Sequence, residues 1–371
     1  MRYTTYGKTG LSVSRLGFGA MRLPANETPD GKEQVDYDKS TPLIRRALEL
    51  GVNFIDTHHN YHYSQSEIAI GLALEGLDRS KVIIQTKNPT WKDLAEGETY
   101  RQRLEDGLKR AKTDYFDIYF LHSLSWQTFE KVGDEFMKMA LQAKEEGLIR
   151  HIGFSTHDKY EGIVKIVDTG LFECMLCQYN LLDLSNEKAI GYAHAKGLGV
   201  SVMGPVGGGR LATPNELARF MPAGQSSPVE AALRFVWDNP GVDSAVSGMS
   251  TIEQVEENVK TVDIAAPLTD AERARIVEIR EEKKKLADLY CTGCGYCMPC
   301  PNGVNIPRVF EYMNWVRVYG FAESAAREHY VWMRNRGSDA SKCVECGQCE
   351  PKCPQKIQII KQLAESHKVL S

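Results

Sequence analysis

Side chains with acid, base and hydrogen-bonding chemistry follow several short apolar runs of the sequence. Asp56 ends the run 52–56, and Tyr61 comes five residues later. Lys87 ends the run 82–87, and His122 follows the run 116–121. Reduction of a carbonyl by hydride requires a proton donor beside the oxygen and polar groups around it. This set could therefore interconvert a carbonyl and an alcohol.

Each of these side chains has a distinct expected role. Tyr61 is the predicted proton donor, and the ammonium of Lys87 would favour its phenolate form. Asp56 would pair with Lys87 and keep it charged, while His122 would orient or polarise the carbonyl. Tyr63 is a nearby competitor for the acid, but the spacing from Asp56 favours Tyr61.

Apolar runs of strand length alternate with longer amphipathic stretches, which is typical of a parallel α/β sheet. Eight strands without a glycine-rich dinucleotide fingerprint after the first one favour a closed (β/α)8 TIM barrel over a doubly wound sheet. In such a barrel the carboxyl ends of the strands carry the chemistry. The predicted strands are 15–19, 52–56, 82–87, 116–121, 149–154, 174–179, 199–203 and 243–247. The predicted helices are 41–50, 65–75, 98–111, 126–146, 158–169, 186–196, 228–239, 251–261 and 270–289.

Other segments carry weaker signals. Residues 1–23 suggest a hairpin before the first strand, and 24–39 form a polar loop. The glycine run 204–209 favours a flexible loop over a phosphate-binding loop. The charged run 281–285 is interpreted as a solvated helix face or linker.

Three histidines, His58, His59 and His62, lie in the loop around Tyr61. They would line a polar substrate pocket, with a metal site as the alternative.

Composition excludes several classes of protein. The 371 residues are 42% hydrophobic and 25% charged, which is typical of a soluble globular protein. A net charge of −4 gives no reason to expect nucleic acid. The start has no apolar signal core and no run approaches a membrane span, so a cytoplasmic protein with no membrane contact is expected.

Eight of the ten cysteines lie after residue 290, which predicts a second domain. Their spacing is CxxCxxCxxCP followed by CxxCxxCxxxCP, typical of two [4Fe–4S] clusters, with structural zinc as the alternative. One predicted ligand set is Cys291, Cys294, Cys297 and Cys353, and the other is Cys343, Cys346, Cys349 and Cys300. The shorter spacing before Cys300 leaves the exchange of fourth ligands open. Cys174 and Cys177 would face opposite sides of a strand and belong to the core.

Most of residues 1–265 resembles the aldo/keto reductase superfamily. Asp56 with Tyr61, Lys87 in Gln-Thr-Lys and His122 in Phe-Leu-His match its catalytic tetrad in order and context. The resemblance implies NADP or NAD lying across the top of the barrel. It also implies that Ser155, Thr156 and Gln178 hold the carboxamide, that Met203 and Gly204 lie at the nicotinamide, and that Ser250, Gln254, Glu257 and Asn258 meet the adenosine phosphate and adenine.

Departures from the family pattern concern the cofactor. Met203 replaces an aromatic residue, Thr156 replaces an asparagine, and Gln254 replaces an arginine that commonly holds the 2′-phosphate. The choice between NADP and NAD is therefore open, and so is a flavin.

The cysteine-rich segment resembles a helical two-cluster ferredoxin domain, with helices expected at 307–319 and 321–336. The predicted domains are a reductase barrel, 1–285, and an iron–sulfur domain, 286–371. The first hypothesis is a soluble aldo/keto reductase that reduces a small-molecule carbonyl or oxidises the corresponding alcohol by hydride transfer. Iron–sulfur clusters pass single electrons, whereas nicotinamide passes two electrons as hydride, so direct exchange between them is difficult. The clusters would therefore organise the domain, or carry electrons to a redox partner protein or to another centre. The second hypothesis is an electron-transfer or redox-sensing protein with a weakly active barrel.

Overall fold

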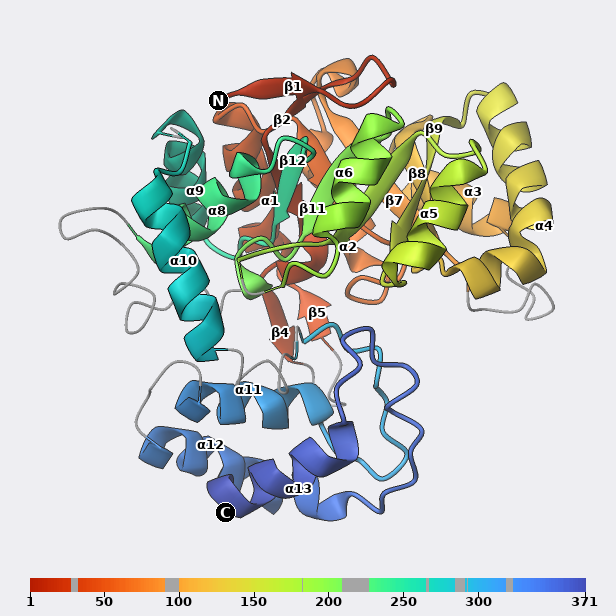
Figure 1. The fold of residues 1–371 in the computed structure, drawn as a ribbon. Coiled ribbons are helices and arrows are strands. Elements are labelled where there is room, and N and C mark those ends of the chain that lie inside the picture. The colour runs from red at the N-terminus through yellow and green to blue at the C-terminus, as the bar shows by residue number, and fades with distance from the viewer. Residues whose placement is uncertain are drawn as a thin grey trace. The chain divides into compact units, whose positions relative to one another are not determined.

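Eight parallel strands form a closed barrel in the computed structural model (Figure 1). Each strand pairs in parallel with its two neighbours, in the order β10-β11-β12-β3-β6-β7-β8-β9. The strands are β3 (Leu16–Gly19), β6 (Phe54–Asp56), β7 (Ile83–Pro89), β8 (Phe116–His122), β9 (Ile149–Thr156), β10 (Cys174–Gln178), β11 (Gly199–Met203) and β12 (Ser244–Ser247). The predicted TIM barrel is confirmed, with strand ends shifted by two residues or fewer. The structure describes residues 1–27, 33–90, 100–181, 183–208, 227–264, 267–283, 291, 293–317 and 323–371.

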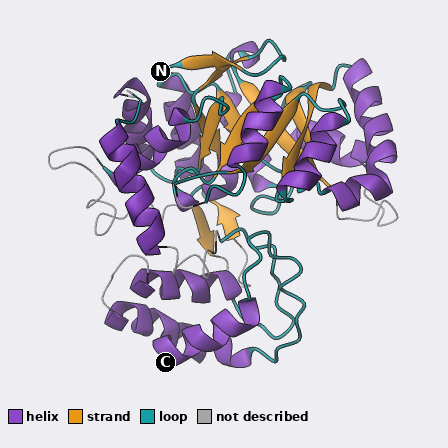
Figure 2. Cartoon of the chain, viewed as in Figure 1, coloured by secondary structure: helices purple, strands orange, loops and turns teal. Residues whose placement is uncertain are grey.

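Helices cover the outside of the strands (Figure 2). They are α1 (Tyr37–Glu49), α2 (Gln65–Leu74), α3 (Tyr100–Arg110), α4 (Trp126–Glu145), α5 (Tyr160–Asp168), α6 (Glu187–Ala195), α8 (Pro228–Asp238) and α9 (Ile252–Ile264). Helix α10 (Asp270–Lys283) follows them in the chain. Helix α1 begins four residues before its predicted start, because the side chain of Asp36 caps it by accepting from Lys39 N. Pro42 consequently lies inside the helix. The expected ends of α3 and α10, at 98–99 and 284–289, lie outside the described residues.

Two short antiparallel hairpins accompany the barrel. The predicted N-terminal hairpin is present as β1 (Tyr3–Thr5) paired with β2 (Ser12–Ser14). The interpretation of 24–39 as a loop was wrong, because β4 (Ala25–Glu27) and β5 (Glu33–Val35) pair there. The Gln65 side chain accepts from Val35 N at 2.9 Å and so ties β5 to α2. Such a pairing depends on this tertiary contact, which a short polar segment does not reveal.

Aromatic and aliphatic side chains fill one layer of the barrel interior, among them Phe54, Phe120, Cys174 and Leu176. Gly153 on β9 makes room for this layer, since a Cβ there would lie 2.0 Å from Cε1 of Phe120. Cys174 and Cys177 are both fully buried, as expected of core residues.

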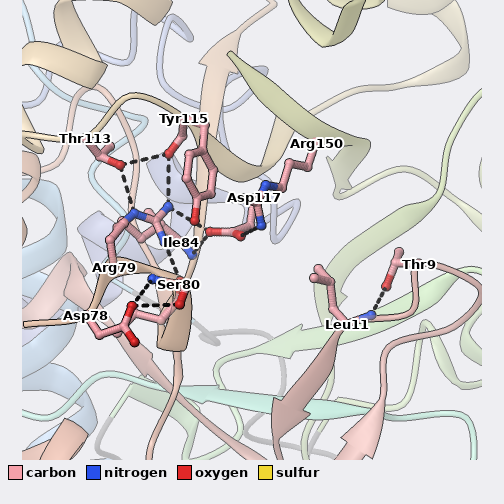
Figure 3. A network of polar contacts seen from close by, with 11 residues as sticks. Thr9, Leu11, Asp78, Arg79, Ser80, Ile84, Thr113, Tyr115, Asp117 and Arg150 are labelled. Atoms are coloured by element: carbon pink, nitrogen blue, oxygen red, sulfur yellow. Dashed lines mark hydrogen bonds and ion pairs between the residues drawn. The ribbon is translucent and has the colours of Figure 1, made fainter. Parts of the chain in front are cut away.

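A polar network ties the amino ends of β7 and β8 together, at the opposite end of these strands from Lys87 and His122 (Figure 3). Asp117 accepts from Arg79 at 2.8 Å and from the backbone N–H of Ile84 at 3.0 Å. Arg79 precedes β7 in the 3-10 helix η2 (Arg79–Lys81). Its guanidinium lies 4.3 Å from the ring centroid of Tyr115, and that of Arg150 lies 3.7 Å from the same ring. This network fixes where both strands begin.

The chain divides into two units, Met1–Pro205 with Ala232–Leu268 and Val206–Ala231 with Thr269–Ser371. The helices of the cysteine-rich segment are α11 (Ile306–Arg317), α12 (Glu323–Asn335) and α13 (Ile359–Leu370). They share an apolar core that includes Phe310, Met313, Tyr330 and Leu363. The expected ends 318–319 and 321–322 lie outside the described residues, and α13 was not predicted. The boundary at 285/286 stays a prediction.

Among the described residues, none of the helices combines the length and the apolar character needed to cross a membrane.

Candidate active site and cysteine cluster

A buried ion pair lies at the carboxyl ends of β6 and β7. The Nζ atom of Lys87 lies 2.6 Å from Oδ1 of Asp56 and donates to the carbonyl oxygen of Thr57 at 2.7 Å. Lys87 is 1% exposed and Asp56 is 4% exposed. Burial lowers the pKa of Lys87, while the carboxylates of Asp56 and Glu67 act in the opposite direction. The paired carboxylates therefore favour the charged form of an ammonium that is cut off from water.

The ring of Tyr61 lies close to this ion pair. Its centroid is 5.1 Å from Nζ of Lys87, and the side chain is half-buried on the turn that follows β6. Tyr63 is 65% exposed. Of the two tyrosines, Tyr61 is the one described in contact with the Lys87 ammonium.

His122, the last residue of β8, meets a second imidazole. Its Nδ1 atom lies 2.7 Å from Nε2 of His58, and the ring centroids are 3.9 Å apart. Burial and the nearby charge of Lys87 hold the pKa of both histidines well below 6.5. Both rings are therefore neutral at neutral pH. The sequence placed His58 near the site but contained no signal that it would contact His122, which is 64 residues away.

Two further polar residues support the ion pair and were missed in the sequence. Gln85 donates from Nε2 to Oδ1 of Asp56 at 2.6 Å, and Glu67 accepts from the Thr86 hydroxyl at 2.9 Å. Burial raises the pKa of Glu67, and Arg110, 2.8 Å away, opposes that rise. The two-residue alternation of a strand could have placed Gln85 on the same side of β7 as Lys87. Glu67 gives no comparable sequence signal.

The histidines near Tyr61 are engaged with different partners. His59 receives a hydrogen bond at Nδ1 from Arg110 at 3.0 Å, and His62 donates from Nε2 to the carbonyl oxygen of Met21 at 3.1 Å. Within the described residues, no three histidine, cysteine or carboxylate side chains converge on a single-ion site. The polar substrate pocket on this loop stays a prediction.

Several predicted cofactor residues gather at the neighbouring strand ends of β9, β10 and β11. The Ser155 hydroxyl accepts from Ser123 N at 2.9 Å. The Thr156 hydroxyl donates to Leu124 O at 2.8 Å and accepts from Asp158 N at 3.0 Å. It is therefore already hydrogen-bonded within the protein, both as donor and as acceptor.

Gln178 on β10 is in register with Met203 on β11, which is half-buried. Gly204 follows with φ +65°, and a Cβ there would lie 2.6 Å from Nε2 of Gln178. The glycine thus lets the Gln178 amide pack against the backbone. The glycine run itself is described only to Gly208.

The other predicted cofactor residues lie at the start of α9. Gln254 accepts from Ser250 N at 2.7 Å, and the Ser250 hydroxyl donates to Arg22 O at 2.7 Å. Ser250, Gln254 and Glu257 are exposed, whereas Asn258 is buried and donates to the Ser247 hydroxyl at 3.1 Å. Gln254 thus caps the start of α9. To bind a phosphate, its side chain would have to break the hydrogen bond with Ser250 N.

The eight cysteines of the C-terminal segment lie near one another, with Cys297 between the others. Burial raises the pKa of the Cys297 thiol to about 12, and the nearby thiols of Cys291, Cys294 and Cys353 add to the rise. Cys353 therefore lies near the first motif although it belongs to the second. The remaining four line one hollow together with Cys297 of the first motif: Cys300, Cys343, Cys346 and Cys349. The division of the eight cysteines into two ligand sets, with the exchange of the fourth cysteine, stays a prediction.

Zinc sites and iron–sulfur clusters arrange their thiolates differently. Zinc holds its thiolates about 2.3 Å from one point. In a cubane, by contrast, each thiolate binds a different iron, so the sulfurs surround a larger body. The donor set and the hollow fit [4Fe–4S] clusters.

Comparisons with known proteins agree with both parts of the chain. Residues 15–281 match the sequence profile of the aldo/keto reductase family, and residues 290–358 match that of the 4Fe-4S dicluster domain. The chain is 30% identical to L-galactose dehydrogenase of Arabidopsis thaliana, covering 69% of this chain and 86% of that protein. It is 26% identical to NADH-specific methylglyoxal reductase of Escherichia coli, covering 76% of this chain and 99% of that protein.

The solved structures agree as well. The holo form of an aldo-keto reductase from Bacillus halodurans is 28% identical and aligns with a TM-score of 0.63, covering 75% of this chain and 96% of that one. The profile match spans well over half of the chain, and the barrel has the expected strands. This chain is therefore an oxidoreductase that belongs to the aldo/keto reductase family and carries a C-terminal 4Fe-4S dicluster domain.

Proposed function

We propose that the barrel transfers hydride between NADPH or NADH and a small carbonyl or alcohol, with Tyr61 as general acid–base. The observation that carries this proposal is the 2.6 Å ion pair of Lys87 and Asp56 with the Tyr61 ring 5.1 Å from the same ammonium. A phenol near an ammonium loses its proton more readily than a phenol in water. Proton transfer from Tyr61 is thereby brought within reach at neutral pH.

Each residue has one part in the proposed reaction. Tyr61 would give its proton to the carbonyl oxygen, and Lys87 would stabilise the phenolate that remains. Asp56 and the Thr57 carbonyl would hold Lys87 in place, and His122 would donate a hydrogen bond to the same carbonyl oxygen. In the alcohol-to-carbonyl direction the phenolate would take the proton back.

A nicotinamide dinucleotide, when bound, would supply the hydride. Ser155, Thr156 and Gln178 would surround its carboxamide, and Met203 with Gly204 would lie against the ring. Ser250, Gln254, Glu257 and Asn258 would meet the adenosine end. The supporting observation is that Gln178 and Met203 are in register at adjacent strand ends, where Gly204 leaves room for the amide.

The test compares Tyr61→Phe with Tyr63→Phe, a matched change at an exposed tyrosine. Methylglyoxal and L-galactose head the substrate panel, because relatives of the chain act on compounds of those names. We expect Tyr61→Phe to lower kcat by roughly 10²- to 10⁴-fold with nucleotide affinity retained, and Tyr63→Phe to keep full activity. Equal and negligible rates for all three proteins over a wide carbonyl panel would instead favour the electron-transfer or redox-sensing function.

We also infer two [4Fe–4S] clusters, one on Cys291, Cys294, Cys297 and Cys353 and one on Cys343, Cys346, Cys349 and Cys300. The support is the gathering of Cys353 with the first motif and of Cys300 with the second. Cys346 is exposed, which suits exchange of single electrons with a redox partner protein.

Metal analysis of anaerobically purified protein tests this assignment. About eight irons per chain are expected for two cubanes, whereas stoichiometric zinc would defeat it. Cys300→Ser should lose iron, while Cys177→Ser, a change at a buried barrel thiol, should keep it. Reduction by dithionite, followed by electron paramagnetic resonance, then tests whether the clusters can accept electrons at all.

A further inference from the structure

His58 and His122 form a closed pair of imidazoles at the end of the barrel that carries the ion pair. His58 is 1% exposed and His122 is 3% exposed. Nε2 of His58 lies 2.7 Å from Nδ1 of His122, so one ring must donate and the other must accept.

A backbone amide decides which ring donates. The N–H of Asn60 donates to Nδ1 of His58 at 3.2 Å. An amide N–H has no lone pair, so Nδ1 of His58 must accept, and a neutral His58 then carries its hydrogen on Nε2. That hydrogen points to Nδ1 of His122, which must accept in turn. The neutral His122 ring therefore carries its own hydrogen on Nε2.

The same two bonds also fix the ring orientations. Turning His58 by 180° would put carbon atoms against both Asn60 N and His122 Nδ1 and would lose both bonds. Turning His122 would put its Cδ2 atom against the Nε2 hydrogen of His58. In a buried site no water can replace a lost hydrogen bond, so each loss is costly.

We propose that His58 is a positioning residue, which holds His122 in the neutral Nε2–H tautomer and in one orientation, so that His122 can donate to the substrate carbonyl. This inference rests on the proposed function for its catalytic meaning. His122 would then polarise the oxygen without giving up a proton, and Tyr61 would supply the proton.

The charges around the pair agree with two neutral rings. Lys87 of β7 and His157, which follows β9, act on His122. His59 on the same loop and Lys87 act on His58, and the Tyr61 ring contacts His58 edge to face at 5.2 Å. The carboxylate of Asp56 is ion-paired with Lys87. Protonating either ring would also require the Asn60 bond or the His58–His122 bond to break.

The direct test is the nitrogen-15 spectrum of the histidine side chains in the full-length protein. Two-bond correlations distinguish the Nδ1–H, Nε2–H and imidazolium forms, and a His122→Gln variant identifies the His122 signals. We expect both His58 and His122 to show the Nε2–H form at pH 7. A hydrogen on Nδ1 of His122 in the unmodified protein would overturn the proposal, whatever the activity is.

Two variants at His58 give the kinetic test. Leucine fills the space but donates nothing, whereas the Nε2 of a glutamine can replace the imidazole donor. We expect His58→Leu to introduce the Nδ1–H form of His122 and to lower kcat roughly 10- to 100-fold with little change in KM. His58→Gln should keep the Nε2–H form and most of the rate.

A His58→Leu protein with the His122 spectrum and kcat of the unmodified protein would refute the positioning role. The spectra do not depend on turnover. If they show the expected tautomers while no variant reduces any carbonyl, the pairing stands and the proposed function fails.

Discussion

The carboxylate of Asp56 and the ammonium of Lys87 lie 2.6 Å apart, and each is almost fully buried. Two hydrogen bonds complete the arrangement: Lys87 donates to the Thr57 carbonyl oxygen, and the Gln85 amide donates to Asp56. A buried charge is tolerated only when it is paired and hydrogen-bonded. The pair thus places a buried ammonium close to the ring of Tyr61.

Asp56→Asn should destabilise the barrel, because it leaves the Lys87 ammonium buried without its carboxylate. A loss of about 3–5 kcal/mol in the free energy of unfolding is expected, together with loss of activity. Urea unfolding followed by circular dichroism measures the loss. The double variant Asp56→Asn/Lys87→Met removes both charges and should recover most of the stability but none of the activity. Equal destabilisation in both variants would show that the charge pair is not the cause.

Stability should fall on acidification because His58 and His122 resist protonation. Their pKa values are held well below 6.5 by burial and by Lys87, so below about pH 6.5 the unfolded chain binds protons that the folded chain does not. The contribution of the two histidines to the free energy of unfolding is fully present above pH 6.5. It is lost as the pH falls toward their pKa values in the folded protein. The two sites together give a limiting slope of about 2.7 kcal/mol per pH unit.

The contribution of one histidine can be separated with His58→Gln, which removes one titrating group and leaves the carboxylates unchanged. The slope of unfolding free energy against pH should then decrease by about 1.4 kcal/mol per pH unit. An unchanged slope between pH 5 and 6.5 would mean that His58 titrates normally in the folded protein.

Gly153→Ala should destabilise the barrel interior. The new Cβ would lie 2.0 Å from Cε1 of Phe120 and 2.9 Å from Cβ of Cys174, and neither buried side chain has room to retreat. A loss of about 1–3 kcal/mol is expected from overpacking. Gly191→Ala is the matched control, because nothing lies within 4 Å of its Cβ position on α6. It should raise stability by up to about 1 kcal/mol, and thermal unfolding of both variants checks the pair.

Gln254→Arg should shift cofactor preference toward NADP. The residue lies in the first turn of α9, where Glu253 and Glu257 are exposed and a 2′-phosphate would meet acidic side chains. A guanidinium–phosphate contact is worth about 1.5–3 kcal/mol, so the ratio of Kd for NAD to Kd for NADP should rise at least tenfold. Gln254→Ala loses the contact to Ser250 without adding charge and serves as the control. An equal ratio in both variants would place the 2′-phosphate elsewhere.

Local sequence was sufficient for the parts of this protein that depend on short-range pattern. The alternation of strands and helices predicted the barrel. The positions of Asp56, Lys87 and His122 at the ends of apolar runs predicted that all three side chains lie at the same end of the barrel. Parallel strands of a closed barrel share their carboxyl ends, so residues far apart in the chain meet there. The cysteine spacing predicted the 4Fe-4S domain for a similar reason, since a cluster needs thiolates at short, fixed intervals.

Only the tertiary structure decided which side chains touch. The contact of His58 with His122 depends on loop paths and rotamers, and a single sequence carries no signal for it. The β4–β5 pairing and helix α13 were missed because short or isolated segments gain their stability from packing rather than from intrinsic propensity. Residue type and spacing thus determined which chemistry is present, whereas side-chain packing determined the protonation and orientation of the groups that would perform it.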